Sequence, residues 1–188
     1  MKMRFIILDL EATCTDNRNI YFDNEVIEIG AVKIENKLVI DEFQSFVKPI
    51  VNTELTEFCK NLTSINQSDV DNAEIFTNVL DNFLSWCYDG IANKNDVLFC
   101  SWGFYDRHQL EKDCERYKIN SDFISNHISL KHQFHNVDKK HTISTKGMGM
   151  TKALRILNIP LDGIHHRGID DAKNIAKIFI KFYDDWDY

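Results

Sequence analysis

The sequence predicts an α/β fold, with a mixed five-stranded sheet flanked by helices. Two observations support this prediction. Three segments rich in apolar and β-branched residues follow one another near the N-terminus, with strand-like rather than helical spacing. Further along the chain, amphipathic helical segments alternate with short apolar strands. A meander followed by such alternation is typical of helices packed on a mixed sheet.

The first half of the chain supplies the meander and two helices. The expected strands cover residues 4–10, 25–34 and 37–47. Glu35 and Asn36 separate the second strand from the third and predict a tight turn between antiparallel partners. Apolar residues spaced three and four positions apart predict helices at residues 55–62 and 73–88.

The second half supplies the remaining strands and three more helices. Short strands are expected at residues 96–100 and 128–130, and helices at residues 105–117, 149–157 and 170–183. The fourth helix is expected to stop before Pro160, because the residue before a proline disfavours helical geometry. The polar stretch 132–146 is expected to be irregular.

Length and composition indicate one domain spanning residues 1–188. The chain is 44% hydrophobic, which suffices for a core without disulfide or metal staples. No apolar run approaches about 18 residues, so no membrane span is expected. The N-terminal apolar run is short and ends in acids, unlike a signal peptide. Five scattered cysteines without a CxxC pair indicate reduced thiols and a cytoplasmic protein, or a nuclear one in a eukaryote.

The net charge of −7 argues against a general nucleic-acid binder, which usually carries a basic excess. The charge is uneven, however. Residues 131–155 contain six lysines and arginines and a single acid, Asp138. This basic window is either a solvated loop or a track for a phosphate backbone.

Two acids stand at the end of the first expected strand. Side chains alternate across a strand, so Asp9 and Glu11 point to the same face. Burying two neighbouring carboxylates costs several kcal/mol, or forces one of them to take a proton, unless a cation compensates. Oxygen ligands of this kind suit Mg²⁺ or Mn²⁺. The alternative is that the strand ends in solvent and both acids are exposed.

A third acid, Asp106, lies in the first turn of an expected helix. The helix dipole alone favours an acid there. Asp106 also heads the apolar row of Leu110 and Cys114, so it faces the core side of the helix.

Helix geometry chooses between two adjacent acids near the C-terminus. Asp171 shares its helix face with Ile175 and Ile178, whereas Asp170 shares its face with the polar Asn174 and Lys177. Asp171 is therefore expected to face inward and Asp170 to face water.

The same choice selects a histidine. The chain contains two H-x4-D pairs, His165 with Asp170 and His166 with Asp171, and the inward acid favours His166. Gly168 is expected to let the intervening loop turn tightly. Four inward acids with no protein cation predicted on their faces indicate a metal site rather than an ion-pair network. A zinc site built from His127, His132 and His135 with a cysteine does not match common finger spacings.

The order D-x-E, then D, then H-x4-D resembles the DEDD exonuclease superfamily of the histidine subtype. Segments 25–34 (EVIEIGAVKI), 55–73 and 166–178 are similar to its enhanced-RNAi and histone-mRNA 3′-exonuclease branch. Two departures occur. Trp102-Gly103-Phe104-Tyr105 precedes Asp106, where many members have an Asn in an N-x-x-F-D setting, and a second histidine precedes His166.

This resemblance implies a ribonuclease H-like fold and two-metal 3′–5′ exoribonuclease activity that releases nucleoside 5′-monophosphates. It implies that two divalent ions, Mg²⁺ or Mn²⁺, are held by four carboxylates, with Asp9 bridging, and that His166 acts as general base. The four implied metal ligands are Asp9, Glu11, Asp106 and Asp171.

The expected substrate is a single-stranded RNA 3′ end. Candidate substrate contacts are the backbone at Ala12 and Thr13 for the terminal ribose, stacking on Phe58, Trp102 and Phe104, and phosphate contacts from Lys139, Lys140 and Lys146. Each aromatic residue has core packing as its alternative role. For Trp102 the functional role is favoured, because this residue follows a strand end close to Asp106.

Two other functions are compatible with parts of the pattern. One is a single-stranded DNA 3′–5′ exonuclease or proofreading-type nuclease, which a comparison of matched DNA and RNA substrates would separate from an exoribonuclease. The other is a catalytically inactive RNA-binding or scaffold protein, which the presence of all five catalytic residue types argues against. Protein partners are not predicted.

Overall fold

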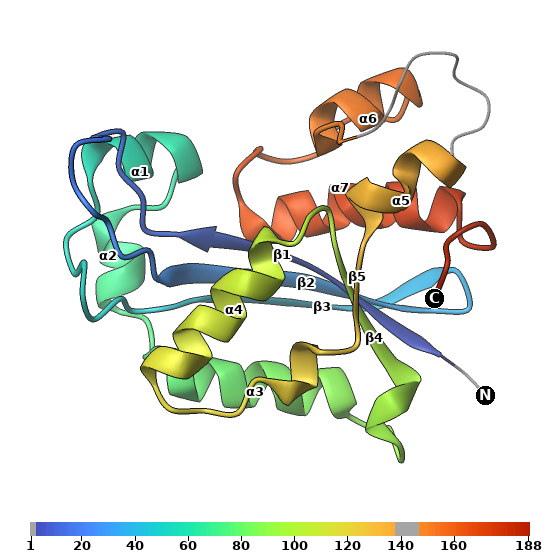
Figure 1. Ribbon diagram of the computed structural model, residues 1–188, viewed down its shortest axis with the longest axis horizontal. Coiled ribbons are helices and arrows are strands. Elements are labelled where there is room, and N and C mark those ends of the chain that lie inside the picture. The colour runs from blue at the N-terminus through green and yellow to red at the C-terminus, as the bar shows by residue number, and fades with distance from the viewer. Residues whose placement is uncertain (1–2, 138–146) are drawn as a thin grey trace.

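The computed structural model describes residues 3–137 and 147–188 and contains one mixed five-stranded sheet (Figure 1). Its strand order is β3-β2-β1-β4-β5, and the predicted mixed five-stranded sheet is confirmed. The strands are β1 (Arg4–Ala12), β2 (Val26–Glu35), β3 (Leu38–Phe46), β4 (Val97–Ser101) and β5 (His127–Ser129).

The first three strands form the predicted antiparallel meander, and β4 and β5 run parallel to β1. The turn between β2 and β3 lies one residue later than predicted. Its two central residues are Asn36 and Lys37, with φ of 52° and 67°. A two-residue hairpin turn of the primed type needs positive φ at both positions, so Glu35 stays in the strand.

Seven helices are described. They are α1 (Glu57–Thr63), α2 (Gln67–Asp71), α3 (Phe76–Tyr88), α4 (Tyr105–Arg116), α5 (Leu130–Val137), α6 (Met150–Ile156) and α7 (Gly168–Lys181), and two short 3₁₀ turns cover Lys94–Asp96 and Asp122–Ile124. None of the helices in the described parts of the chain is long and apolar enough to cross a membrane.

Two helices were not predicted. The expectation that residues 132–146 are irregular is wrong for 132–137, which belong to α5; residues 138–146 lie outside the described part of the chain. Leu130, Phe134 and Val137 are all buried, and their spacing of four and three residues gives α5 an apolar face. Helix α2 has too few residues for such a pattern, with Val70 as its one buried residue.

The sheet separates two apolar layers. Alternate residues of β1 and β2, such as Phe5 and Val32, form one core cluster with Ile175 and Phe179 of α7. The intervening residues, such as Leu8, join the opposite cluster, to which α3 and α4 contribute. In Figure 1, α3 and α7 accordingly lie on opposite sides of the sheet.

This alternation places Asp9 and Glu11 on the face that α7 covers. Residues directly opposite in an antiparallel pair share a face, and the register pairs Asp9 with Gly30 and Glu11 with Glu28. The start of α7 lies against the strands there. A Cβ atom at Gly30 would lie 2.0 Å from the carbonyl carbon of Gly168, which brings the helix terminus close to the acids.

Candidate active site

The acids converge on a cavity of about 460 Å³ at the end of β1, next to the starts of α4, α6 and α7. All five predicted catalytic residues line this cavity, together with the neighbouring histidine: Asp9, Glu11, Asp106, His165, His166 and Asp171. Residues separated by more than 160 positions in the sequence thus share one surface.

Three of the carboxylates are close enough to share an ion. Asp9, Glu11 and Asp171 each offer an oxygen, and these oxygens lie within 4.8 Å of one another. Glu11 is 7% exposed and Asp9 is half-buried, so the alternative of a strand end carrying two solvent-exposed acids is wrong. Asp171 is 3% exposed. Asp106 is also buried, and its Oδ1 accepts a hydrogen bond from the Leu10 backbone N–H at 3.1 Å.

The metal-free cluster favours protonated carboxyl groups. Burial, and then repulsion from Asp106 and Glu11, raises the pKa of Asp9 well above its ordinary value. Burial and the charge of Asp171 raise the pKa of Glu11 to about 8. Burial raises the pKa of Asp106 to about 6, although the backbone N–H of Leu10 opposes this shift.

No lysine or arginine among residues 3–137 and 147–188 forms an ion pair with Asp9, Glu11 or Asp106. Buried carboxylates without a cationic partner fit a divalent ion, and an oxygen-only donor set fits Mg²⁺ or Mn²⁺ better than zinc. Lys131, at the start of α5, lines the cavity and contributes a positive charge that residue spacing alone does not single out.

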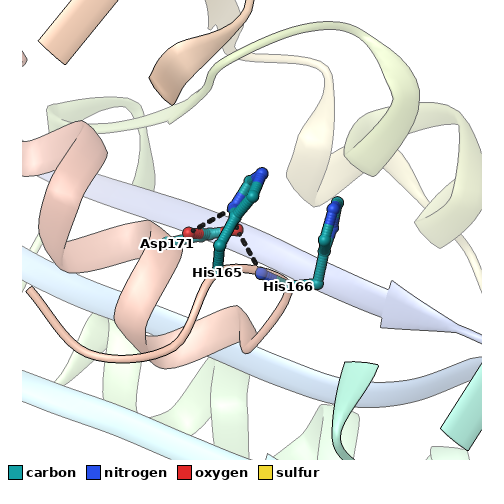
Figure 2. A group of neighbouring side chains, drawn as sticks. All are labelled: His165, His166 and Asp171. Atoms are coloured by element: carbon teal, nitrogen blue, oxygen red, sulfur yellow. Dashed lines mark hydrogen bonds and ion pairs between the residues drawn. The ribbon is translucent and has the colours of Figure 1, made fainter. Parts of the chain in front are cut away.

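The two histidines contact Asp171 in different ways (Figure 2). The Nδ1 atom of His165 lies 2.8 Å from Oδ2 of Asp171, whereas His166 reaches the same oxygen through its backbone N–H at 3.0 Å. Their rings stack, with centroids 3.9 Å apart. Both imidazoles line the cavity, so the choice of His166 as general base stays a prediction.

The loop carrying these histidines differs from expectation in one respect. The left-handed residue is His166, with φ of 65°, and not Gly168. Gly168 is required for a different reason, since a Cβ atom there would lie 2.9 Å from the Asp9 carbonyl oxygen. Burial and the neighbouring His165 lower the pKa of His166, which favours the neutral imidazole that can accept a proton.

Asp170 is half-buried rather than free in water, because its carboxylate accepts from the Ile164 N–H at 2.8 Å. Its helix neighbour Asn174 is fully buried, and the Asn174 Oδ1 accepts from the backbone N–H of Asp162 at 3.1 Å. The prediction that this polar face of α7 meets solvent is therefore wrong at Asn174. The polar side chains hold the preceding loop instead.

The predicted terminal-ribose contacts lie in two different environments. Ala12 lines the cavity. Thr13 is buried, its Oγ1 accepts from the Glu25 N–H at 2.9 Å, and its own N–H donates to the Glu25 carbonyl. The Thr13 side chain thus takes part in strand-end pairing.

The aromatic candidates differ from one another in burial and in position relative to the cavity. Trp102 lines the cavity but is only 7% exposed, packs on Phe134, and donates its Nε1–H to the Met148 carbonyl at 2.8 Å. Phe58 and Phe104 are 38% and 39% exposed, so core packing is not their role. Neither lines the cavity, and the Phe104 ring lies 4.7 Å from that of His132.

The remaining predicted contacts, Lys139, Lys140 and Lys146, lie outside the described residues. The zinc alternative gains no support from the described part of the chain. His127 Nε2 lies 2.9 Å from the Ser101 hydroxyl and His132 Nδ1 lies 2.7 Å from the Ser129 hydroxyl. Neither histidine belongs to a group of three potential metal ligands there.

The raised pKa values predict that metal stabilisation grows with pH. Glu11 ordinarily titrates at 4.5 and does so at about 8 in the metal-free folded protein, so the folded state holds a proton that the unfolded chain has released. Its contribution to stability is fully present below pH 4.5 and is lost as pH rises to about 8. A divalent ion held by Asp9, Glu11 and Asp171 would displace that proton and restore the stability.

We therefore expect the increase in Tm at a fixed Mg²⁺ concentration to be larger at about pH 8 than at about pH 6. Thermal unfolding followed by circular dichroism, with and without Mg²⁺, measures this difference. The Glu11→Gln variant is the control and should show a weaker pH dependence. An increase in Tm that is the same at both pH values would contradict the expectation.

Comparison with known proteins shows the family to which the chain belongs. Residues 6–179 match the family model described as Exonuclease (RNase_T). The chain belongs to this exonuclease family, and the predicted resemblance to the DEDD nucleases of the histidine subtype is confirmed.

Two curated relatives are similar to nearly the whole of this chain. The chain is 32% identical over 184 residues to the rat 3′-5′ exoribonuclease 1, a match that covers 95% of this chain and 52% of the relative. It is 30% identical over 202 residues to the 3′-5′ exonuclease eri1 of Schizosaccharomyces pombe, covering 94% of this chain and 66% of the relative. The chain thus spans about half the length of the rat relative.

A solved structure confirms the ribonuclease H-like fold. The nuclease domain of 3′hExo, described as a DEDDh family member bound to rAMP, superposes with a TM-score of 0.88 at 29% identity. The superposition covers 98% of this chain and 93% of that domain.

Proposed function

We propose that this chain is a metal-dependent 3′–5′ exoribonuclease that hydrolyses single-stranded RNA 3′ ends to nucleoside 5′-monophosphates. One observation carries the proposal: carboxylate oxygens of the half-buried Asp9 and the buried Glu11 and Asp171 gather within 4.8 Å of one another, beside two imidazoles in a cavity. The likeness to relatives named 3′-5′ exoribonuclease supports RNA as the substrate class.

The metal ligands in this proposal are Asp9, Glu11, Asp106 and Asp171, with Asp9 as the bridging ligand. Two divalent ions, Mg²⁺ or Mn²⁺, would supply charge neutralisation at the scissile phosphate and activation of the attacking water. The carboxylates come from β1, α4 and α7, so the cluster forms only when these elements pack together.

The remaining groups of the cavity handle protons and charge. His166 accepts a proton from the attacking water, and its lowered pKa keeps its imidazole neutral near physiological pH. His165 holds the Asp171 carboxylate through Nδ1. Lys131 on the cavity wall offers a cation to a substrate phosphate.

Digestion of 5′-labelled oligonucleotides tests the proposal. Matched single-stranded RNA and DNA are incubated with Mg²⁺, with Mn²⁺ and with a chelator. We expect RNA to shorten stepwise from its 3′ end, a 3′ phosphate to slow the first step, and the chelator to stop hydrolysis. Preferential digestion of DNA would instead support the single-stranded DNA nuclease, and binding without cleavage would support the inactive RNA-binding protein.

The basic window predicts a salt-dependent contribution to RNA binding. Lys139, Lys140 and Lys146 supply half of its six positive charges. Replacing all three with alanine should weaken RNA binding and reduce the slope of log Kd against log salt concentration by about 2, since each phosphate contact on a single strand contributes about 0.7. Fluorescence anisotropy with labelled RNA at several salt concentrations measures both quantities.

A charge-matched control removes three exposed lysines elsewhere, Lys48, Lys94 and Lys181. Its Kd should change less, and its salt slope should stay close to that of the wild type. Equal effects of the two triple variants would show that the basic window acts only through net charge.

The cysteines bear on where the protein works. All five are free thiols, and four of them are buried. We place the protein in a reducing compartment, the cytoplasm or the nucleus, because unpaired buried thiols are typical of such proteins.

A further inference from the structure

Glu28 on β2 is a buried acid that the proposed chemistry does not use. Its side chain has no exposed surface, and it lies directly opposite Glu11 on the sheet face that α7 covers. We propose that Glu28 and Arg167 form a positioning pair that fixes the first turn of α7 and thereby sets His166 and Asp171 against the β1 carboxylates. This inference rests on the proposed function for its role in catalysis.

Both carboxylate oxygens of Glu28 accept hydrogen bonds from N–H groups. Its Oε2 accepts from the backbone N–H of Gly168 and from Nε of Arg167, each at 3.1 Å. Its Oε1 accepts from Nε2 of Gln44 at 3.0 Å and lies 3.4 Å from Nη2 of Arg167. Because four N–H groups surround this carboxylate, it is satisfied without a metal ion.

Arg167 and Gly168 connect Glu28 to the cavity. The Arg167 carbonyl accepts from the Asp171 N–H at 2.9 Å, which closes the first helical turn. The His166 N–H in turn donates to the Asp171 carboxylate. A displacement of Arg167 therefore moves both His166 and Asp171.

The glycine contact under α7 and the Glu28 contact constrain different motions. A Cβ at Gly168 would lie 2.9 Å from the Asp9 carbonyl oxygen, so this contact limits how closely the helix approaches the sheet. It does not prevent the helix terminus from rotating or sliding along the strands. The directional hydrogen bonds from Gly168 and Arg167 to Glu28 restrict those motions.

Charge provides a second reason to treat the two residues as a pair. Arg167 forms an ion pair with Glu28 and so offsets part of the charge of this fifth acid beside the carboxylate cluster. The Arg167 guanidinium also lies over the Phe46 ring, 5.2 Å from its centroid, which limits its orientation. Removing Arg167 would leave Glu28 buried beside the proposed metal ligands without a cationic partner.

Three variants test the pair: Glu28→Gln, Arg167→Gln and Arg167→Lys. Glu42→Gln is the matched control, because Glu42 on β3 also pairs with α7, through Lys173 at 2.7 Å, but on an exposed surface. Mn²⁺ affinity is measured without substrate by electron paramagnetic resonance, kcat and KM are measured with RNA, and Tm is measured for each metal-free protein.

We expect Glu28→Gln and Arg167→Gln to weaken Mn²⁺ binding about 10–100-fold, as loss of a group that orients metal ligands does. The kcat should fall by a similar factor, with KM within about threefold of wild type. Arg167→Lys should recover part of both losses. Glu42→Gln should match the wild type in Mn²⁺ affinity and kcat.

Mn²⁺ affinity of Arg167→Gln equal to that of Glu42→Gln would overturn the inference. Arg167→Gln tests the positioning pair even if Glu28→Gln does not fold. The Arg167 side chain is 21% exposed, so shortening it leaves no cavity in the apolar core. A wild-type chain that binds Mn²⁺ but leaves RNA intact would contradict the proposed function alone, and the Mn²⁺ titrations would still test the positioning pair.

Discussion

Replacing Asp9 with asparagine is expected to lower kcat for RNA hydrolysis at least about 1,000-fold, which is about 4 kcal/mol of activation free energy. The substitution preserves volume but removes the charge that would bridge two cations. It also removes one of several mutually repelling carboxylates. The Tm of the metal-free protein should therefore stay the same or rise while activity disappears.

This combination distinguishes a metal ligand from a structural residue. Circular dichroism melts and single-turnover digestion of labelled RNA measure the two effects on the same protein preparation. Asp81→Asn, on the exposed face of α3, is the control and should change neither quantity. A large fall in Tm for metal-free Asp9→Asn would show that Asp9 stabilises the fold through contacts of its own, contrary to the proposed role.

Replacing Gly30 with alanine is expected to produce the largest loss of stability among conservative substitutions. A methyl group there would lie 2.0 Å from both the Gly168 carbonyl carbon and the Ile169 nitrogen, so the backbone of α7 must move away from the sheet. Overpacking against backbone should cost more than about 3 kcal/mol, or a fall in Tm of more than about 6 °C.

Thermal unfolding of Gly30→Ala checks this expectation, with Gly103→Ala as the matched control. The nearest atom to a Cβ at Gly103 is 3.9 Å away, so that substitution should change Tm by only a few degrees at most. A Gly30→Ala protein as stable as the control would mean that α7 does not need its close approach to β1 and β2.

Local periodicity explains which parts of the site could be predicted. Strand alternation placed Asp9 and Glu11 on one face, and helix rows turned Asp106 and Asp171 inward, because each face depends on a few neighbouring residues. The five-stranded sheet followed from the same patterns. The predicted boundaries of helices and strands were less accurate. The turn predicted at Glu35 and Asn36 lies at Asn36 and Lys37, because both of these residues have positive φ.

Features that depend on the backbone conformation of a loop, or on the meeting of two distant segments, could not be predicted in this way. The bond from His165 to Asp171 requires the left-handed backbone of His166, which spacing alone does not reveal. Glu28 appeared only as part of a strand. Its position opposite Glu11 depends on the β1–β2 register, and its contacts depend on where α7 packs.

The most direct test of the carboxylate cluster as a metal site is anomalous scattering from crystals grown with Mn²⁺. The proposed function predicts anomalous peaks in contact with oxygens of Asp9, Glu11 and Asp171, with Asp106 completing the site. A cavity without such peaks, in which Asp9 and Glu11 instead form ion pairs with Lys131, would contradict the assignment of the chain as a metal-dependent nuclease.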